Sequence, residues 1–321
     1  MASTDTLKTS APRAFRFDPA QLGLIGAFIL LVVLAQWFHP GFLTWSNIRL
    51  ILIQNAPLGI IAVGMTFVMI AGGFDLSVGA TYAFAATMFA KVANSGGLVL
   101  AGVEALVLGL VCGLINGVLV AVFRVNAFVA TLGTASIFAG TAYVYSNSQP
   151  FVASDRSFFF LGQGTWGPLP VGVWILLAVV VIGGLVLSRT IFGQAIYAVG
   201  GNETAARLSG MRVGAVRIAA FAAVGVLSAL AGMIQASRLG VGQADIGGTM
   251  PLDAIAVVVI GGTSLFGGEG AIWRTVLGLL FVGVITNLFY SLAVDSNIQL
   301  IAKGALVIAA VWIDVWLRSR R

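Results

Sequence analysis

The sequence predicts an all-α, polytopic integral membrane protein with about ten transmembrane helices. Of its 321 residues, 59% are hydrophobic and only 9% are charged, whereas soluble domains carry about 25% charged residues. The mean hydropathy is +1.04, and the apolar residues gather in long runs with almost no charge. Because so few charged groups cannot cover a water-exposed surface, soluble enzymes, nucleic-acid-binding modules and disordered chains are excluded.

Ten apolar runs are candidates for the individual membrane helices. A hydrocarbon core about 30 Å thick requires roughly 20 mostly apolar residues per helix. The runs are 22–38, 49–71, 77–93, 98–123, 126–146, 171–188, 215–237, 251–266, 271–292 and 297–317. The two shortest internal runs, 77–93 and 251–266, are either full spans or half-helices and re-entrant segments. No small-residue cleavage site follows 22–38, so we expect a retained first helix rather than a signal peptide.

The distribution of lysine and arginine predicts that both termini are cytoplasmic. With the N-terminus inside, twelve of the 17 basic residues fall on the cytoplasmic side and five outside, as the positive-inside rule requires. The expected organisation is a cytoplasmic tail at 1–21, one transmembrane domain at 22–317 and a second cytoplasmic tail at 318–321. Two longer polar connections lie at about 147–170, predicted to be outside, and about 189–214, predicted to be cytoplasmic.

The run at 98–123 carries small residues at a spacing of four, including Gly109, Gly113 and Gly117. This spacing places them on one helix face, where small side chains let another helix come close. Two interpretations remain open, tight helix packing and one wall of a translocation path. Asn116, next to Gly117, is positioned to form a hydrogen bond across such a contact.

Two segments share the form G-G-x-x-L-x-x-G, one at 72–79 and the other at 261–268. Glycines break helices, and a broken membrane helix is tolerated only inside protein or beside a water-filled cavity. The segments are therefore either breaks that line a transport path or tight turns at the membrane surface. The candidate residues are Gly72, Gly73, Asp75, Ser77, Gly79, Gly261, Gly262, Thr263 and Ser264, together with Asn116.

A short helix of about seven residues is predicted in the cytoplasmic connection, between Asn202 and Gly210. Asn202 is a good N-cap, Glu203 suits the first turn, and Gly210 suits the position after the C-cap. Glu203 and Arg207 form an i,i+4 pair. Helices shorter than about 12 residues are marginal in water, so its apolar side chains need a surface. That surface is either this protein and the bilayer or a second protein.

No catalytic motif accompanies these features. The sequence has no G-x-x-x-x-G-K-[ST] phosphate loop and no G-x-S-x-G elbow. Cys112 and His39 are the only residues of their kinds, which excludes an intramolecular disulfide and an ordinary zinc site. The sequence therefore predicts no enzyme and no cofactor in this chain, and any ATP must be bound by another chain.

Several motifs together resemble the permease family of bacterial ABC importers for ribose and related sugars. They are Arg189–Gly193, Ile196–Asn202, Ala205–Gly210, Gly72–Gly79, Asn116–Gly117, Phe128–Thr134 and Leu252–Ala256 followed by Gly261–Leu265. The resemblance covers about residues 45–315, and it adds Thr131 to the candidate path residues. Gln194 stands where the family commonly has arginine, and Met250-Pro251 stands where Tyr-Glu is usual.

The resemblance implies a permease of the bacterial inner membrane that forms the translocation path for a ribose-like monosaccharide. It implies a second permease copy, either identical or a close paralogue, a cytoplasmic ABC ATPase that holds ATP and magnesium, and a periplasmic sugar-binding protein. The setting is a lipid bilayer, without nucleic acid. The ATPase-coupling segment would comprise Gly200, Gly201, Asn202, Glu203, Ala205, Ala206, Arg207, Leu208, Ser209 and Gly210. The alternative function is an ion-coupled secondary transporter of a small polar solute.

Overall fold

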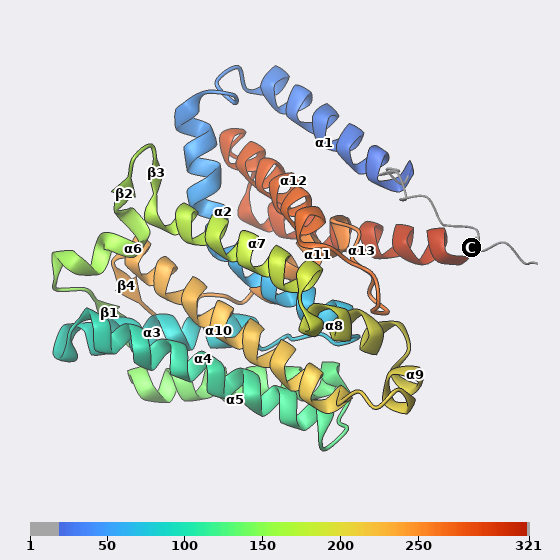
Figure 1. Ribbon diagram of the computed structural model, residues 1–321. Coiled ribbons are helices and arrows are strands. Elements are labelled where there is room, and N and C mark those ends of the chain that lie inside the picture. Colours follow the sequence, from blue (N-terminus) through green and yellow to red (C-terminus); the bar gives the residue numbers. More distant parts are fainter. Residues whose placement is uncertain (1–18, 320–321) are drawn as a thin grey trace, which may run out of the picture.

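The computed structural model describes residues 19–319 and is almost entirely helical (Figure 1). Within these residues, six helices are long and apolar enough to cross a membrane. They are α2 (Trp45–Ile70), α4 (Leu98–Ala121), α5 (Ala127–Ser146), α7 (Val171–Arg189), α10 (Val213–Leu239) and α12 (Ile272–Ser291). The all-α prediction is confirmed for the described residues, and the protein is a multi-pass membrane protein. A total of ten spans stays a prediction.

The remaining helices fill the other predicted apolar runs, and shorter helices lie in the connections. They are α1 (Pro19–Phe38), α3 (Val78–Gly96), α6 (Phe160–Gln163), α8 (Ile191–Gly201), α9 (Glu203–Leu208), α11 (Met250–Ile260), α13 (Ser296–Ser319) and the 3-10 helix η1 (Arg156–Phe159). Each of the ten predicted runs contains a helix. The run at 251–266 is helical only as far as Ile260, because the glycines that follow end α11. Its eleven residues rise only about 16 Å, half of the hydrocarbon core.

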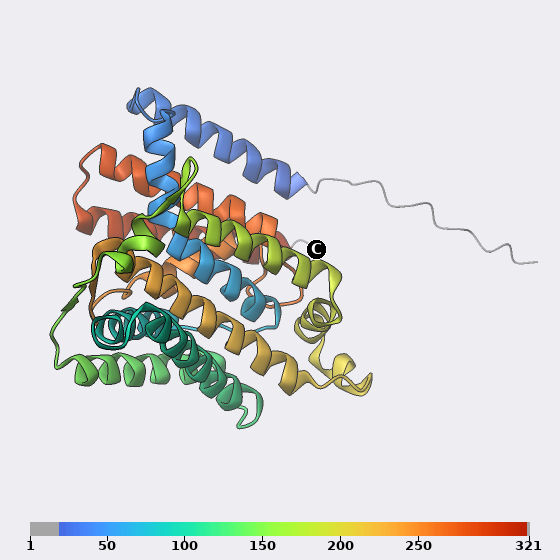
Figure 2. The ribbon, with the colours of Figure 1, turned by 60° about the vertical axis from the view of Figure 1, so that its left-hand side comes forward.

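Helix α2 forms the centre of the bundle. Its residues from Ala56 to Ile70 are buried without interruption, as expected for a helix that is apolar on every side. Helix α10 packs against α2, α3 and α4, and α12 and α7 also contact α2. Helix α1 lies at the periphery against α12 (Figure 2).

The two polar connections lie at opposite ends of the bundle. Strand β1 (Phe151–Val152) pairs antiparallel with β4 (Val241–Gly242), and β2 (Thr165–Trp166) pairs with β3 (Leu169–Pro170). These strands lie at one end with α6, whereas α8 and α9 lie at the other (Figure 1). The start of α1 and the end of α13 also point toward the α8–α9 end in both ribbon views.

That these two ends lie on opposite sides of the membrane stays a prediction. Which end is cytoplasmic stays a prediction. The predicted tails fall mostly on residues 1–18 and 320–321, which lie outside the described residues. The described parts of these tails are helical, since α1 begins at Pro19 and α13 continues to Ser319.

Candidate functional site

Helix α9 forms where the capping residues predict it. The Asn202 side chain accepts a hydrogen bond from the amide of Ala205 at 2.9 Å. At the other end, Gly210 has a φ of +81°, and the amide of Met211 donates to the carbonyl of Ala206. This bond across a left-handed glycine is typical of a helix C-terminus. The helix has six residues, one fewer than predicted.

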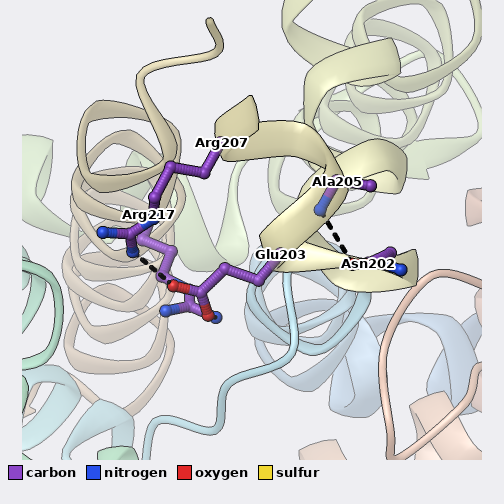
Figure 3. A network of polar contacts seen from close by, with 5 residues as sticks. All are labelled: Asn202, Glu203, Ala205, Arg207 and Arg217. Atoms are coloured by element: carbon purple, nitrogen blue, oxygen red, sulfur yellow. Dashed lines mark hydrogen bonds and ion pairs between the residues drawn. The ribbon is translucent and has the colours of Figure 1, made fainter. Parts of the chain in front are cut away.

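Glu203 is held by two arginines rather than one. Its carboxylate oxygens lie 2.7 Å from Arg207 on the same helix and 2.7 Å from Arg217 on α10 (Figure 3). Partial burial raises the pKa of Glu203, but the hydrogen bonds and charges of the two arginines outweigh it and leave the pKa below its usual value. The predicted pair with Arg207 is therefore present, and Arg217 additionally ties α9 to α10.

The apolar side chains of α9 divide between two environments. Ala206 is only 4% exposed and packs with Val199 of α8 and Val213 of α10. Leu208 is 84% exposed, and Ala205 is also exposed. Of the surfaces considered from the sequence, α9 rests on its own chain through Ala206. That a second protein covers Leu208 stays a prediction.

The last residues of α8 meet both glycine-rich loops. A Cβ atom added to Gly200 would overlap the carbonyl oxygen of Ile70, the last residue of α2, and would lie 2.6 Å from the amide of Gly268. The Gly268 amide itself donates to the Ile70 carbonyl at 2.9 Å. A Cβ atom on Gly267 would lie 3.0 Å from Cα of Gly72. We call this contact between Gly72, Gly200, Gly267 and Gly268 the glycine junction.

A buried chain of hydrogen bonds holds the first loop. Thr134 of α5 donates to the Asn116 side chain at 2.6 Å, Asn116 of α4 donates to the Ser77 hydroxyl at 2.7 Å, and Ser77 donates to Asp75 at 2.7 Å. All four side chains are at most 4% exposed. Thr131 is buried one turn before Thr134 and bonds to its own helix at the Ala127 carbonyl.

Asp75 lies in the connection between α2 and α3, outside both helices. Burial raises the pKa of its carboxyl to about 6, and the hydrogen bonds from Ser77 and Asn116 partly oppose this rise. The structure thus brings together the candidates Asp75, Ser77 and Asn116. Thr134 is the last residue of the Phe128–Thr134 motif, but it was not predicted from the sequence as a candidate site residue.

The second loop is held mainly by its backbone. The Ser264 amide donates to the Glu269 carbonyl at 2.9 Å, and Tyr197 of α8 donates to the Gly270 carbonyl at 2.7 Å. Thr263 is buried, and its hydroxyl has no hydrogen-bond partner among the described residues. A Cβ atom on Gly261 would overlap the carbonyl of Arg274 at the start of α12. Tyr197 and Arg217 were both missed from the sequence, because their partners are distant in the chain.

The small residues of α4 lie directly against α10. A Cβ atom on Gly109 would meet the Gly225 carbonyl at 2.5 Å, and one on Gly117 would meet Cα of Ile218 at 2.8 Å. A Cβ atom on Gly113 would overlap the Phe221 carbonyl in the same way. This close approach is what the packing interpretation requires. Gly79 likewise lies against the connection before α11, at the Gly247 carbonyl. Whether any of these residues lines a translocation path stays a prediction.

Comparison with known proteins identifies a family over most of the chain. Residues 47–311 match the family model described as branched-chain amino acid transport system / permease component. The chain is 39% identical over 300 residues to the ribose import permease protein RbsC of Haemophilus influenzae, covering 92% of this chain and 93% of that protein.

Further relatives have similar coverage. The ribose import permease protein RbsC of Bacillus subtilis is 40% identical over 323 residues, covering 97% of this chain and 98% of its own. The L-arabinose transport system permease protein AraH of Escherichia coli K12 is 37% identical over 325 residues, covering 98% of this chain and 97% of that protein. No solved structure matches.

Proposed function

Because this chain belongs to the branched-chain amino acid transport system / permease component family, with ribose and arabinose permeases among its relatives, we propose that it is the permease subunit of an ATP-driven ABC sugar importer. Its substrate is a monosaccharide such as ribose or L-arabinose, delivered by a periplasmic binding protein. The chain works in the bacterial inner membrane as one of a pair of permease copies. ATP and magnesium bind to a separate cytoplasmic ATPase and not to this chain.

The observation that carries the proposal is the exposed surface of α9. A six-residue helix would not persist alone in water, yet this one is capped at both ends, anchored through Ala206 and paired with α10 through Arg217. Leu208 nevertheless remains 84% exposed. A rigid helix with an unburied apolar side chain suits docking into a groove of the ATPase, where that apolar area leaves water.

The glycine junction supplies a route from this helix to the bundle. Movement of α9 moves the end of α8, because only Asn202 separates them. Gly200 lies in direct contact with Ile70, the last residue of α2, and with Gly268 of the α11–α12 loop. Close-packed backbones cannot move independently. An ATPase that draws two copies of α9 together would therefore shift the α2–α3 and α11–α12 loops, which we propose as the coupling step.

The test is Leu208→Glu, which places a charge on the proposed docking surface at a side chain that is 84% exposed. Ala206→Glu is a poorer probe, because Ala206 is buried against α8 and α10 and its substitution would unseat α9. The matched control is Val152→Glu, since Val152 is 67% exposed and lies at the opposite end on β1. Both are measured by ATP-driven sugar uptake and by the amount of ATPase that co-purifies.

We expect Leu208→Glu to lower uptake and ATPase recovery by tenfold or more, because hot-spot side chains contribute about 2 kcal/mol or more, and Val152→Glu to leave ATPase recovery unchanged. Wild-type uptake in Leu208→Glu would contradict the coupling role of α9. Uptake driven by an ion gradient in liposomes that contain this chain alone would replace the proposal with a secondary transporter.

A further inference from the structure

A cleft of about 520 Å³ opens beside α9. Its walls come from the start of α10, the connection between α4 and α5, Gly72 and α9 itself. The charged groups that line it are Arg124, Glu203, Arg207 and Arg217. Arg124 comes from the α4–α5 connection, so the cleft separates this connection from α9.

The cleft carries an excess of positive charge. Three guanidinium groups and one carboxylate line it, which leaves a net charge of about +2 because arginine stays protonated. One guanidinium nitrogen of Arg207 and one of Arg217 donate hydrogen bonds to Glu203, and each group has two further nitrogens. Arg124 is exposed and has no ion-pair partner among the described residues. Guanidinium groups in this number favour a phosphate oxyanion.

The surface next to Arg124 is apolar and uncovered. Val122 is 60% exposed and Phe123 is 69% exposed directly after α4, while Phe128 and Val129 at the start of α5 are 55% and 60% exposed. In a membrane-spanning chain such side chains contact acyl chains. A cationic cleft next to exposed apolar residues matches the boundary between phospholipid headgroups and hydrocarbon. A soluble anion or an acidic peptide would leave those apolar side chains uncovered.

We propose that this cleft binds the phosphate headgroup of an anionic phospholipid, with the acyl chains along the exposed ends of α4 and α5. The phosphate lies between Arg124 on one wall and Arg207 and Arg217 on the other. It thereby links the α4–α5 connection to α9 and holds α9 at the membrane surface. Binding needs neither the ATPase nor the sugar, so this inference is independent of the proposed function.

The test measures lipid binding to the purified, delipidated full-length chain by native mass spectrometry. The probes are phosphatidylglycerol, cardiolipin and phosphatidylcholine. The variant is Arg124→Asn, chosen because Arg124 has a φ of +56° and asparagine tolerates this conformation better than other polar residues. The matched control is Arg189→Asn, since Arg189 is exposed near the same end of the bundle but does not line the cleft.

We expect Arg124→Asn to weaken binding of both anionic lipids about fivefold, the effect of one basic residue near an anionic headgroup. Arg189→Asn should bind them as the wild-type chain does, and phosphatidylcholine should bind weakly to all three. A charge-retaining variant, Arg124→Lys, should restore most of the anionic-lipid binding.

Three outcomes would overturn the proposal. One is equal binding of phosphatidylglycerol by Arg124→Asn and the wild-type chain. Another is that inorganic phosphate or glycerol 3-phosphate binds as tightly as the lipid, which would make this a site for a soluble anion. The third is a loss of ATPase co-purification in Arg124→Asn with lipid binding unchanged, which would assign the cleft to an acidic protein partner.

Discussion

The two loops with the pattern G-G-x-x-L-x-x-G use the same local structures but are stabilised differently. At the end of α2, Gly72 donates to the carbonyl of Met69 and Gly73 to that of Val68; at the end of α11, Gly262 donates to Val259 and Thr263 to Val258. The left-handed residue is Gly72, with a φ of +81°, in one loop and Gly262, with +82°, in the other.

Helix α11 therefore ends one residue closer to the shared pattern than α2 does. The left-handed residue is the first glycine of the pair in the first loop and the second glycine in the second loop. The turn that follows keeps the pattern. Asp75 accepts from the amide of Ser77, and Ser264, at the equivalent position, accepts from the amide of Phe266. Aspartate and serine both form such turns with the amide two residues later.

The surroundings of the loops differ more than their backbones. The first loop is fixed by buried side chains, through Asp75, Ser77 and Asn116. The second is fixed by backbone carbonyls, one of which accepts from Tyr197 of α8. Both then meet at the glycine junction. A shared sequence pattern therefore specifies the turn, while the neighbouring helices decide what holds it.

The largest effect should come from the residue that touches both loops. Gly200→Ala places a methyl group on the Ile70 carbonyl and close to Gly268. Overpacking against backbone costs about 1–3 kcal/mol or more, so we expect a marked fall in thermal stability and loss of sugar uptake. Gly201→Ala is the matched control, because its Cβ would have no neighbour within 4 Å. Equal stability of the two variants would show that the junction is not close-packed.

Removing the carboxyl of the first loop should have the next largest effect. Asp75→Ala leaves the buried hydroxyl of Ser77 without its acceptor, which costs about 1–3 kcal/mol. Ser264→Ala at the equivalent position removes one acceptor for the amide of Phe266 and should cost less, about 1 kcal/mol. Thermal unfolding in detergent measures both. A larger loss in Ser264→Ala would contradict the distinction between side-chain and backbone support.

The same carboxyl gives the first loop a pH dependence, whereas Ser264 at the equivalent position of the second loop has no titratable group. The pKa of Asp75 is raised from 3.8 to about 6, so the folded state binds the proton more tightly than the unfolded state. Stability from this group is fully present below pH 3.8 and is lost as the pH rises through about 6. In Asp75→Asn this part of the pH dependence should disappear, as seen by thermal unfolding between pH 4 and 7.

A smaller effect should separate the glycines within each pair. Gly72→Ala forces alanine into a left-handed conformation at φ +81° and should cost about 1 kcal/mol, whereas Gly73→Ala meets only ordinary contacts at 3.4 Å and should be tolerated. In the second loop both Gly261→Ala, which would overlap Arg274, and Gly262→Ala, at φ +82°, should destabilise. An unchanged unfolding temperature in Gly72→Ala would contradict the left-handed conformation of Gly72, and with it the difference between the two loops.

The sequence predicts those parts of the molecule that depend on residues near one another in the chain. Apolar runs locate the long helices, and Asn202 and Gly210 define α9 because caps act within one turn. The small-residue spacing of α4 predicts its contact with another helix but does not identify α10. The ion pair of Glu203 with Arg217 and the contact of Gly200 with Gly268 join residues far apart in the chain. Neither leaves a periodic pattern, so neither could be predicted.

The smallest effect, and the only one of opposite sign, is expected at the second loop. The hydroxyl of Thr263 is buried and has no hydrogen-bond partner among the described residues, so Thr263→Val replaces an uncompensated polar group by a methyl group of similar shape. Such an exchange is neutral or stabilising, by up to about 1 kcal/mol. Ser77→Ala in the first loop is the contrast, because it removes a hydroxyl that both donates to Asp75 and accepts from Asn116.

If Thr263→Val destabilised the chain as much as Ser77→Ala, the Thr263 hydroxyl would have a partner, such as a bound water or a transported sugar hydroxyl. Measuring both variants with and without the sugar would distinguish these, since only a sugar contact makes the loss depend on its presence.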